Sequence, residues 1–260
     1  MTKPIFAMLF AGIAIQAQQF EVASVRQSAP EAILESFVPT LNVTPGATLR
    51  IRNRQLKELI QIAYGVGGRQ VAGPQWLIDP QVARSEIPRF DIEAKVPADA
   101  RREDGPVMLQ NLLAERFHLR VHREKRQITI YGIDVSKGGL KVSPNAGGGS
   151  SGGGGCARSL YGDNGVTTAV CRDMTVAQLA QQLQTLSPAY FPDGPVVDKT
   201  ALKDTYTFNL AWITLQQRDD GEEGPSMFDA MEKQGLHVEK QKGEAEVLVV
   251  DQIDPRPTDN

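Results

Sequence analysis

One order of predicted secondary-structure elements occurs twice in this chain of 260 residues. The first copy is predicted as a strand (49–51), a helix (55–64), a strand (90–96), a helix (107–117) and a closing hairpin (119–123 and 128–135). From residue 166 a short strand is followed by a helix (175–186), strands (194–197 and 205–212), a helix (226–234) and two last strands (236–240 and 245–253). The recurrence predicts two similar modules of ordinary domain size.

The spacing of apolar residues supports these assignments. Phe90, Ile92, Ala94 and Val96 alternate with charged residues, which is typical of an antiparallel strand with one buried face. Residues 55–64 instead carry apolar side chains at the i, i+3, i+4, i+7 spacing of an amphipathic helix. A strand at residues 20–25 is predicted to precede the first module.

Three pairs of landmarks suggest an internal duplication. They are Gly73-Pro74 with Gly194-Pro195, residues 90–94 with 208–212, and residues 117–122 with 235–239. We therefore predict an α+β fold of two tandem modules, each a small mixed or antiparallel sheet with two helices on one face. The predicted division is 18–144 for the first module, a Gly- and Ser-rich linker at 145–155, 156–254 for the second module, and a tail at 255–260. The acidic segment 216–224 is predicted to be a disordered loop.

The N-terminus is predicted to be a signal peptide. Lys3 precedes an apolar run at residues 5–15, and small residues allow cleavage near Ala17, so residues 1–17 would be removed. The run is too short to span a bilayer, and no later run is long enough. The alternative is a buried N-terminal helix. Export predicts a periplasmic or extracellular mature protein with no integral membrane span.

Charge and composition exclude some partners. The formal net charge is −3, which argues against a nucleic-acid partner because phosphate binding needs clustered Lys and Arg. The two cysteines, Cys156 and Cys171, would pair as a disulfide in an exported protein, with two free thiols as the alternative.

The histidines are the first candidates for chemistry. His118 and His122 share one face of a predicted strand, Glu124 could join them, and His237 has a matching place in the second module. The neighbouring Arg120 would repel a cation, so a solvated strand face is favoured. We predict no metal site and no cofactor.

Asp198 and Lys199 form the best isolated acid–base pair in the sequence. They follow a predicted buried strand, and a turn in which Asp198 bonds to backbone N–H groups is the favoured interpretation. No Gly-x-Ser-x-Gly nucleophile motif is present, and the run of glycines before Cys156 lacks the Lys of a phosphate-binding loop. No catalytic residue is predicted. The alternative is a secreted hydrolase using Asp198, Lys199, His122 and His237.

Several segments in order resemble one family of exported proteins of unknown function, the DUF3738 family, which is numerous in soil Acidobacteria. They are residues 20–25, 56–65, 73–77, 89–95, 112–119 and 197–200. In relatives the region can follow a membrane metallopeptidase of a sensor type, so the resemblance implies an extracytoplasmic sensing or docking role. Ala201 and Asp204 stand where that family usually has glycine. The order of elements also looks like the small signalling modules of secretins and TonB-dependent receptors.

The sequence therefore favours a non-catalytic envelope module that binds or senses a protein or peptide. The expected mode is addition of an extended partner segment to an exposed sheet edge, where backbone N–H and C=O groups are unpaired.

Overall fold

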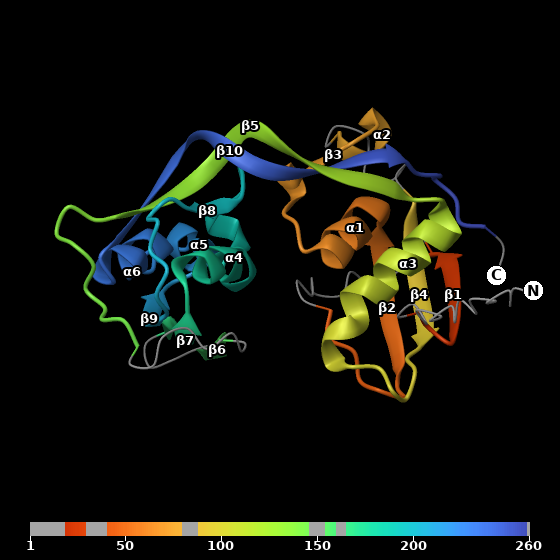
Figure 1. Ribbon diagram of the computed structural model, residues 1–260, viewed down its shortest axis with the longest axis horizontal. Helices are drawn as coiled ribbons and strands as arrows, with labels where there is room; N and C mark the ends of the chain where they lie inside the picture. The colour runs from red at the N-terminus through yellow and green to blue at the C-terminus, as the bar shows by residue number, and fades with distance from the viewer. Residues whose placement is uncertain (1–18, 30–40, 80–87, 146–153, 160–164, 259–260) are drawn as a thin grey trace, which may run out of the picture.

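The computed structural model describes residues 19–29, 41–79, 88–145, 154–159 and 165–258. Two lobes lie side by side beneath a long two-stranded ribbon that crosses both of them (Figure 1). The described strands form three sheets of three, four and three strands, and helices pack beside them. The predicted α+β class is confirmed.

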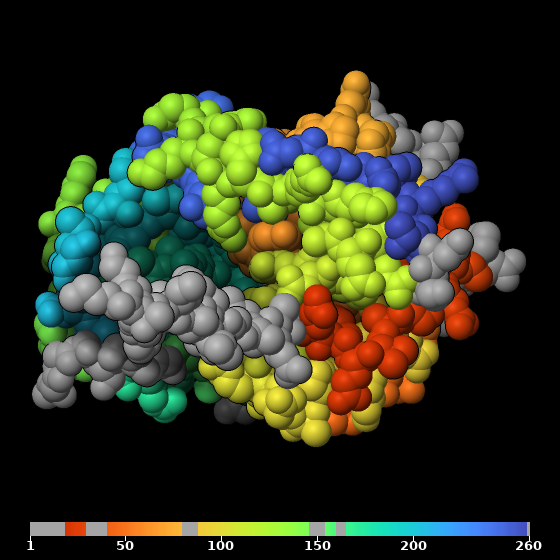
Figure 2. All heavy atoms as spheres, turned by 45° about the vertical axis from the view of Figure 1, so that its right-hand side comes forward, coloured from red at the N-terminus to blue at the C-terminus, as the bar shows by residue number. Residues whose placement is uncertain are grey.

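The ribbon consists of β5 (Arg120–Val135) and β10 (Leu236–Gln252). These strands are antiparallel, and their register runs from Leu236 opposite Val135 to Gln252 opposite Arg120. Figure 2 shows the ribbon lying over both lobes, with a recess between the lobes beneath it. The ribbon thus pairs two segments that are far apart in the sequence.

The predicted closing hairpin is wrong, and so is the division of residues 236–253 into two strands. Residues 119–123 and 128–135 belong to one continuous strand, and residues 236–240 and 245–252 to another. A tight hairpin needs residues that accept positive φ, and residues 124–127 contain no Gly, Asn or Pro. Gly243 does not form a turn. It leaves room for the side chain of the facing strand, since a Cβ at this position would lie 2.4 Å from Ile130 Cδ1.

The first lobe contains a sheet in the order β1-β4-β2. Its strands are β1 (Val22–Gln27), β2 (Thr48–Gln55) and β4 (Arg89–Lys95), and its helices are α1 (Leu56–Tyr64), α2 (Gln75–Ile78) and α3 (Gly105–Phe117). The alternation in β4 is as predicted, because Phe90, Ile92 and Ala94 are all buried.

The second lobe contains a sheet in the order β6-β7-β9. Its strands are β6 (Gly155–Ser159), β7 (Thr167–Met174) and β9 (Tyr206–Trp212), and its helices are α4 (Val176–Leu186), α5 (Leu215–Asp219) and α6 (Met227–Lys233). Helix α5 corrects the prediction that residues 216–224 are disordered. Thr214 caps this helix, and the Gln217 side chain donates to the Gly165 carbonyl oxygen at 2.9 Å.

A third sheet connects the lobes in the order β3-β10-β5-β8. The short strand β3 (Val71–Ala72) comes from the first half of the chain but pairs in parallel with β10. The short strand β8 (Val196–Asp198) comes from the second half but pairs in parallel with β5. Each half of the chain therefore contributes one short strand to the long strand of the other half.

The two main hydrophobic cores are shared in the same way. The core of the first lobe includes Leu248 and Val250 from β10, and the core of the second lobe includes Tyr131 and Ile133 from β5. Residues 146–153 of the predicted linker lie outside the described residues. The lobes are joined by far more than a linker, because each core is completed by residues from the other half.

One proposed landmark pair is not equivalent in the structure. Gly73-Pro74 follows β3 and leads into α2, whereas Gly194-Pro195 precedes β8. At Gly194 the backbone approaches the ribbon so closely that a Cβ would lie 1.8 Å from the Thr129 carbonyl oxygen. This glycine is required by a close approach between backbones.

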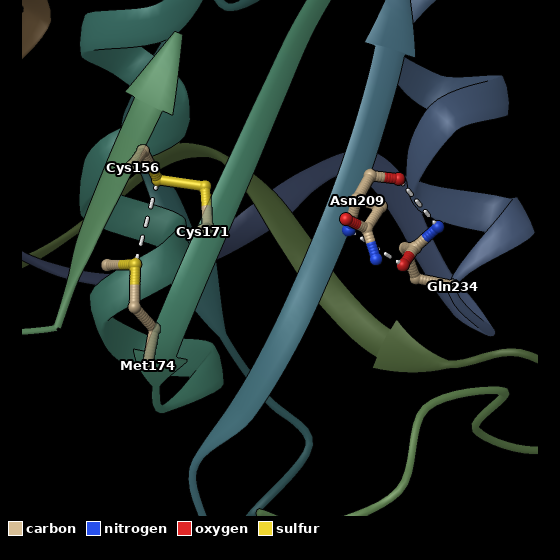
Figure 3. Close-up of a disulfide and its surroundings, with 5 residues drawn as sticks. All are labelled: Cys156, Cys171, Met174, Asn209 and Gln234. Atoms are coloured by element: carbon tan, nitrogen blue, oxygen red, sulfur yellow. Dashed lines mark hydrogen bonds between the residues drawn. A yellow bond between two sulfur atoms is a disulfide. The ribbon is translucent and has the colours of Figure 1, made fainter.

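The predicted disulfide between Cys156 and Cys171 is present. The two residues lie directly opposite each other in the β6–β7 pair, so the bond fastens β6 to the sheet (Figure 3). Closing a loop of 15 residues contributes about 3 kcal/mol by the chain-entropy model. Cys171 is completely buried, which fixes that end of the bond in the core.

Replacing Gly194 by Ala should destabilise the protein by at least about 3 kcal/mol, because the new methyl group would force β8 away from the ribbon. Thermal and urea unfolding of the full chain measure the change. Gly138→Ala is the matched control, since nothing lies within 4 Å of the Cβ position there and φ is not positive. Equal stability of the two variants would contradict the close packing at Gly194.

Candidate functional site

His122 lies on the exposed face of the ribbon, near the start of β5. Its Nδ1 is 2.9 Å from both carboxylate oxygens of Asp251, and its Nε2 is 3.6 Å from Glu124. The hydrogen bond to the Asp251 carboxylate is the main cause that raises the pKa of His122. The side chain is half exposed. This ion pair links β5 to β10 on the solvent-exposed face of the ribbon.

The other two histidines also pair with carboxylates on the surface. His118 Nδ1 lies 2.8 Å from Asp254, and His237 Nδ1 lies 3.3 Å from Glu232. His118 ends α3 with a left-handed φ of 50°. Each imidazole therefore stabilises a local junction.

Asp198 and Lys199 form the turn that was predicted from their position. The Asp198 carboxylate accepts from the Thr200 backbone N–H at 2.8 Å and from the Thr200 hydroxyl at 2.7 Å. Lys199 Nζ donates to Gln241 Oε1 on β10 at 2.9 Å. The Asp198 side chain thus stabilises its own turn, and the Lys199 side chain bonds to the ribbon.

The structure does not bring the hydrolase candidates together. Asp198 of β8 lies opposite Ile133 of β5. His122 is eleven residues before Ile133 on β5, which is about 36 Å along that strand. His237 is opposite Asp134, toward the Asp198 end of the ribbon. Within the described ranges no three His, Cys, Asp or Glu side chains are placed to hold a metal ion.

The signal-peptide prediction lies outside the described residues, since residues 1–18 are not described. Among those that are, no helix is long and apolar enough to cross a lipid bilayer.

A groove of about 480 Å³ lies between β1 and α3. Val22, Met108 and Leu112 supply its apolar lining, and Glu115 and Arg116 lie at its polar side. The Arg116 guanidinium donates to the Ala23 carbonyl oxygen at 3.2 Å. One backbone acceptor along the β1 edge is therefore already engaged by a side chain.

The outer edge of β9 is also covered. The Gln234 side chain accepts from the Asn209 N–H at 3.2 Å and donates to the Asn209 carbonyl at 3.0 Å (Figure 3). Further along, the Asn145 N–H donates to the Thr205 carbonyl oxygen at 2.9 Å. Gln234 thus takes the place of an edge-strand residue at Asn209.

The outer edge of β2 is different, because no strand pairs with it among the described residues. The Val96 N–H donates to the Ala47 carbonyl oxygen. The backbone N–H and C=O groups of the odd-numbered residues 47, 49 and 51 therefore point toward β4. Thr48 and Arg50 consequently direct their backbone N–H and C=O groups outward. No strand or side chain in the described part of the chain bonds to them.

The exposed face beside this edge is charged. Arg50 lies 3.1 Å from Glu93, and Arg52 lies 3.7 Å from Asp91. The opposite face carries Leu49, which is half-buried, and Ile51, which is buried. The alternation of residues 49–52 was visible in the sequence, but which edge of which strand lacks a neighbour depends on the fold.

A family model described as "Protein of unknown function (DUF3738)" matches residues 57–253. The chain belongs to the DUF3738 family. The match includes both strands of the ribbon and the second lobe, whereas β1 and β2 of the first lobe precede it. No curated protein and no solved structure matches the chain.

Replacing Asp251 by Asn should lower the pKa of His122 toward that of a free imidazole, because the hydrogen bond to a carboxylate is lost. An NMR titration of the imidazole signals measures this. Since the folded-state pKa is raised, the stabilisation by this pair is complete below the unfolded-state pKa and disappears as the pH rises through the folded-state pKa. Asp254→Asn, which affects His118, is the control that should leave the titration of His122 unchanged.

Ala201 follows the Asp198 turn and has a left-handed φ of 58°. This conformation is costly for a residue with a Cβ, so Ala201→Gly should stabilise the protein by about 0.5–1 kcal/mol. Urea unfolding measures the change. Ala157→Gly makes the same chemical change at ordinary φ in β6 and should be destabilising. A loss of stability in Ala201→Gly would contradict this account of the turn.

Proposed function

We propose that this protein is a non-catalytic binding or sensing protein of the cell envelope. It takes up an extended segment of a partner protein along the outer edge of β2. The observation that carries this proposal is a difference between the lobes: β7 is paired on its outer edge with β6, and β2, its counterpart, has no neighbour there in the described part of the chain.

The comparison of β2 with β7 rests on an internal duplication, which we also propose. Both strands contain a register shift near their end, and each shift includes a residue with φ of 53°, Asn53 in β2 and Asp173 in β7. Each strand then leads directly into a helix with a capping box, at Gln55 in α1 and Thr175 in α4. Two matching irregularities of this kind support a common origin, because irregular backbone is costly and local.

The ribbon supports the same proposal. His118 and Gly235, 117 positions apart, both have left-handed φ at the end of a helix and precede the two long strands. Tyr131 and Gly132 pair with β8, and the residues 117 positions later, Leu248 and Val249, pair with β3. One offset relates the helix ends and both exchanged strand pairings. This shared offset supports the proposed duplication.

Under this equivalence, β6 indicates how a strand can occupy the edge. It lies antiparallel to β7 over five residues, with Cys156 opposite Cys171. Ile51 of β2 corresponds to Cys171, since each immediately precedes the register shift. An extended segment beside β2 would satisfy the outward N–H and C=O groups of Thr48 and Arg50 in the same way. Main-chain hydrogen bonds would supply affinity, and the alternating side chains would supply specificity.

The placement of the acidic and basic candidates favours binding over catalysis. Asp198, Lys199, His122 and His237 each have a structural partner, and His122 lies at the far end of the ribbon from the other three. The alternative of a secreted hydrolase predicts turnover that is lost in both His122→Ala and Asp198→Asn. A broad hydrolase substrate panel on the full chain tests that alternative.

An extracytoplasmic location, periplasmic or extracellular, completes the proposal. The Cys156–Cys171 bond supports it, because disulfides persist in oxidising compartments. A partner in such a compartment would be an envelope protein or a peptide.

Arg50→Pro should abolish binding of an extended segment and leave the fold intact. Proline removes the outward N–H of Arg50, and an edge strand tolerates this where the N–H does not face its partner strand. The measurement is panning of a random-peptide display library on the full chain, followed by affinity determination for the enriched peptides. Those peptides should bind Arg50→Pro at least tenfold more weakly.

Arg50→Ala is the matched control, because it removes the side chain and keeps the N–H group, so any weakening in Arg50→Pro beyond that in Arg50→Ala is due to the lost N–H. Circular dichroism and thermal unfolding of both variants confirm the fold. Enriched peptides that bind Arg50→Pro as tightly as the unmodified chain would place binding away from the β2 edge and end the proposal.

A further inference from the structure

Charges alternate in sign from strand to strand across the exposed face of the first-lobe sheet. In one row, Arg26 of β1 lies opposite Asp91 of β4, and Arg52 of β2 lies 3.7 Å from that carboxylate. In the next row, Glu93 of β4 lies 3.1 Å from Arg50. The sheet thus has positive side chains on β2 and negative ones on its paired neighbour, and the position beyond β2 has no strand in the described residues.

Arg50 and Arg52 keep room for a second partner. Their side chains are 58% and 37% exposed although both already contact β4 carboxylates. A guanidinium carries five N–H donors in a planar fork, so one carboxylate on the β4 side does not exhaust it. On the far side of β2, a neighbouring strand would lie about 4.8 Å away, within reach of these donors.

We infer that the segment taken up by β2 is acidic, with carboxylate side chains opposite Arg50 and Arg52. This inference rests on the proposed binding at the β2 edge and specifies the chemistry of the partner. Opposite charges on directly facing residues of antiparallel strands stabilise the pair, and like charges destabilise it. A row of positive, negative and positive side chains is therefore continued best by a negative one.

The residues between the carboxylates face the other side of the sheet and are apolar. They lie beside Leu49 and Ile51, which pack against the core of the first lobe. In the second lobe the corresponding residue of β6, Cys156, is packed against that lobe's core. The partner motif is consequently an alternation of acidic and apolar residues, antiparallel to β2 as β6 is to β7.

A second copy of this chain does not fit the same edge. Antiparallel pairing of β2 with another β2 would bring Arg50 and Arg52 of both copies together on one face. Like charges directly opposite are destabilising, so these arginines also act against self-association through this edge.

The test uses the full chain and two synthetic peptides of seven residues, one alternating Glu with Val and one alternating Lys with Val. The Glu peptide should bind at least about tenfold more tightly at 0.15 M salt, and its affinity should fall as salt is raised. Amide NMR signals of Thr48, Arg50 and Arg52 should shift on its addition. Sedimentation of the free chain checks for pairing between copies.

Arg50→Gln/Arg52→Gln should reduce the preference for the Glu peptide to nearly one. Arg26→Gln is the matched control, because it removes a positive charge from the same face on β1. That residue is about 14 Å from the added strand, beyond the screening length at this salt concentration, so the preference should persist. Arg50→Pro should abolish binding of the Glu peptide.

Three outcomes would overturn the inference. Equal binding of both peptides, with sensitivity to Arg50→Pro, would refute an acidic partner and leave strand addition at β2 standing. A Glu preference that survives Arg50→Gln/Arg52→Gln, or falls equally in Arg26→Gln, would show that other charges select the peptide. Binding of neither peptide, or self-association that Arg50→Pro prevents, would refute an acidic segment as the occupant of this edge.

Discussion

The antiparallel pairing of β5 with β10 is the interaction on which the rest of the structure depends. It brings together two strands whose starts are more than a hundred residues apart in the chain, and each strand delivers buried residues to the lobe of the other half. Since β3 and β8 also pair across the halves, neither lobe has a complete core without the ribbon. Cooperative unfolding of the two lobes is the physical consequence, because loss of the ribbon exposes both cores together.

The two lobes share a register shift with left-handed backbone, in β2 and in β7, but their sheet edges differ. In the first lobe β1 covers the outer edge of β4, and in the second lobe β6 covers the outer edge of β7. At the other end of each sheet, the outer edge belongs to β2 in the first lobe and to β9 in the second. Gln234 protects the β9 edge with a side-chain amide, and Arg116 engages the β1 edge. Exposed edges are usually protected in this way because unpaired backbone groups invite another chain. Among the described residues nothing protects the β2 edge in this way, so it contrasts with the others.

The charged side chains of this protein stabilise surfaces and junctions. The histidines bond to carboxylates that lie far apart in the sequence, and Lys240 reaches Asp193 at 2.6 Å to tie the ribbon to the second lobe. That contact holds the pKa of the Asp193 carboxyl below its ordinary value. Exposed pairs of this kind contribute little individually. Together they tie the two ribbon strands to each other and the ribbon to the second lobe.

Local sequence determined the α+β class, the buried face of β4, the amphipathic helices and the cysteine pair, because side-chain periodicity and turn chemistry act over a few residues. Tertiary structure decided the rest. The polar stretch at residues 124–127 interrupts the apolar pattern in the way a turn does, although it lacks Gly, Asn and Pro, and pairing with β10 makes it part of one long strand. Likewise, the local sequence presents Arg50 only as a solvated strand residue. That no strand of the described part of the chain pairs with its outer edge follows from the fold. Which backbone groups remain unpaired is a property of the whole arrangement, since it depends on segments distant in sequence.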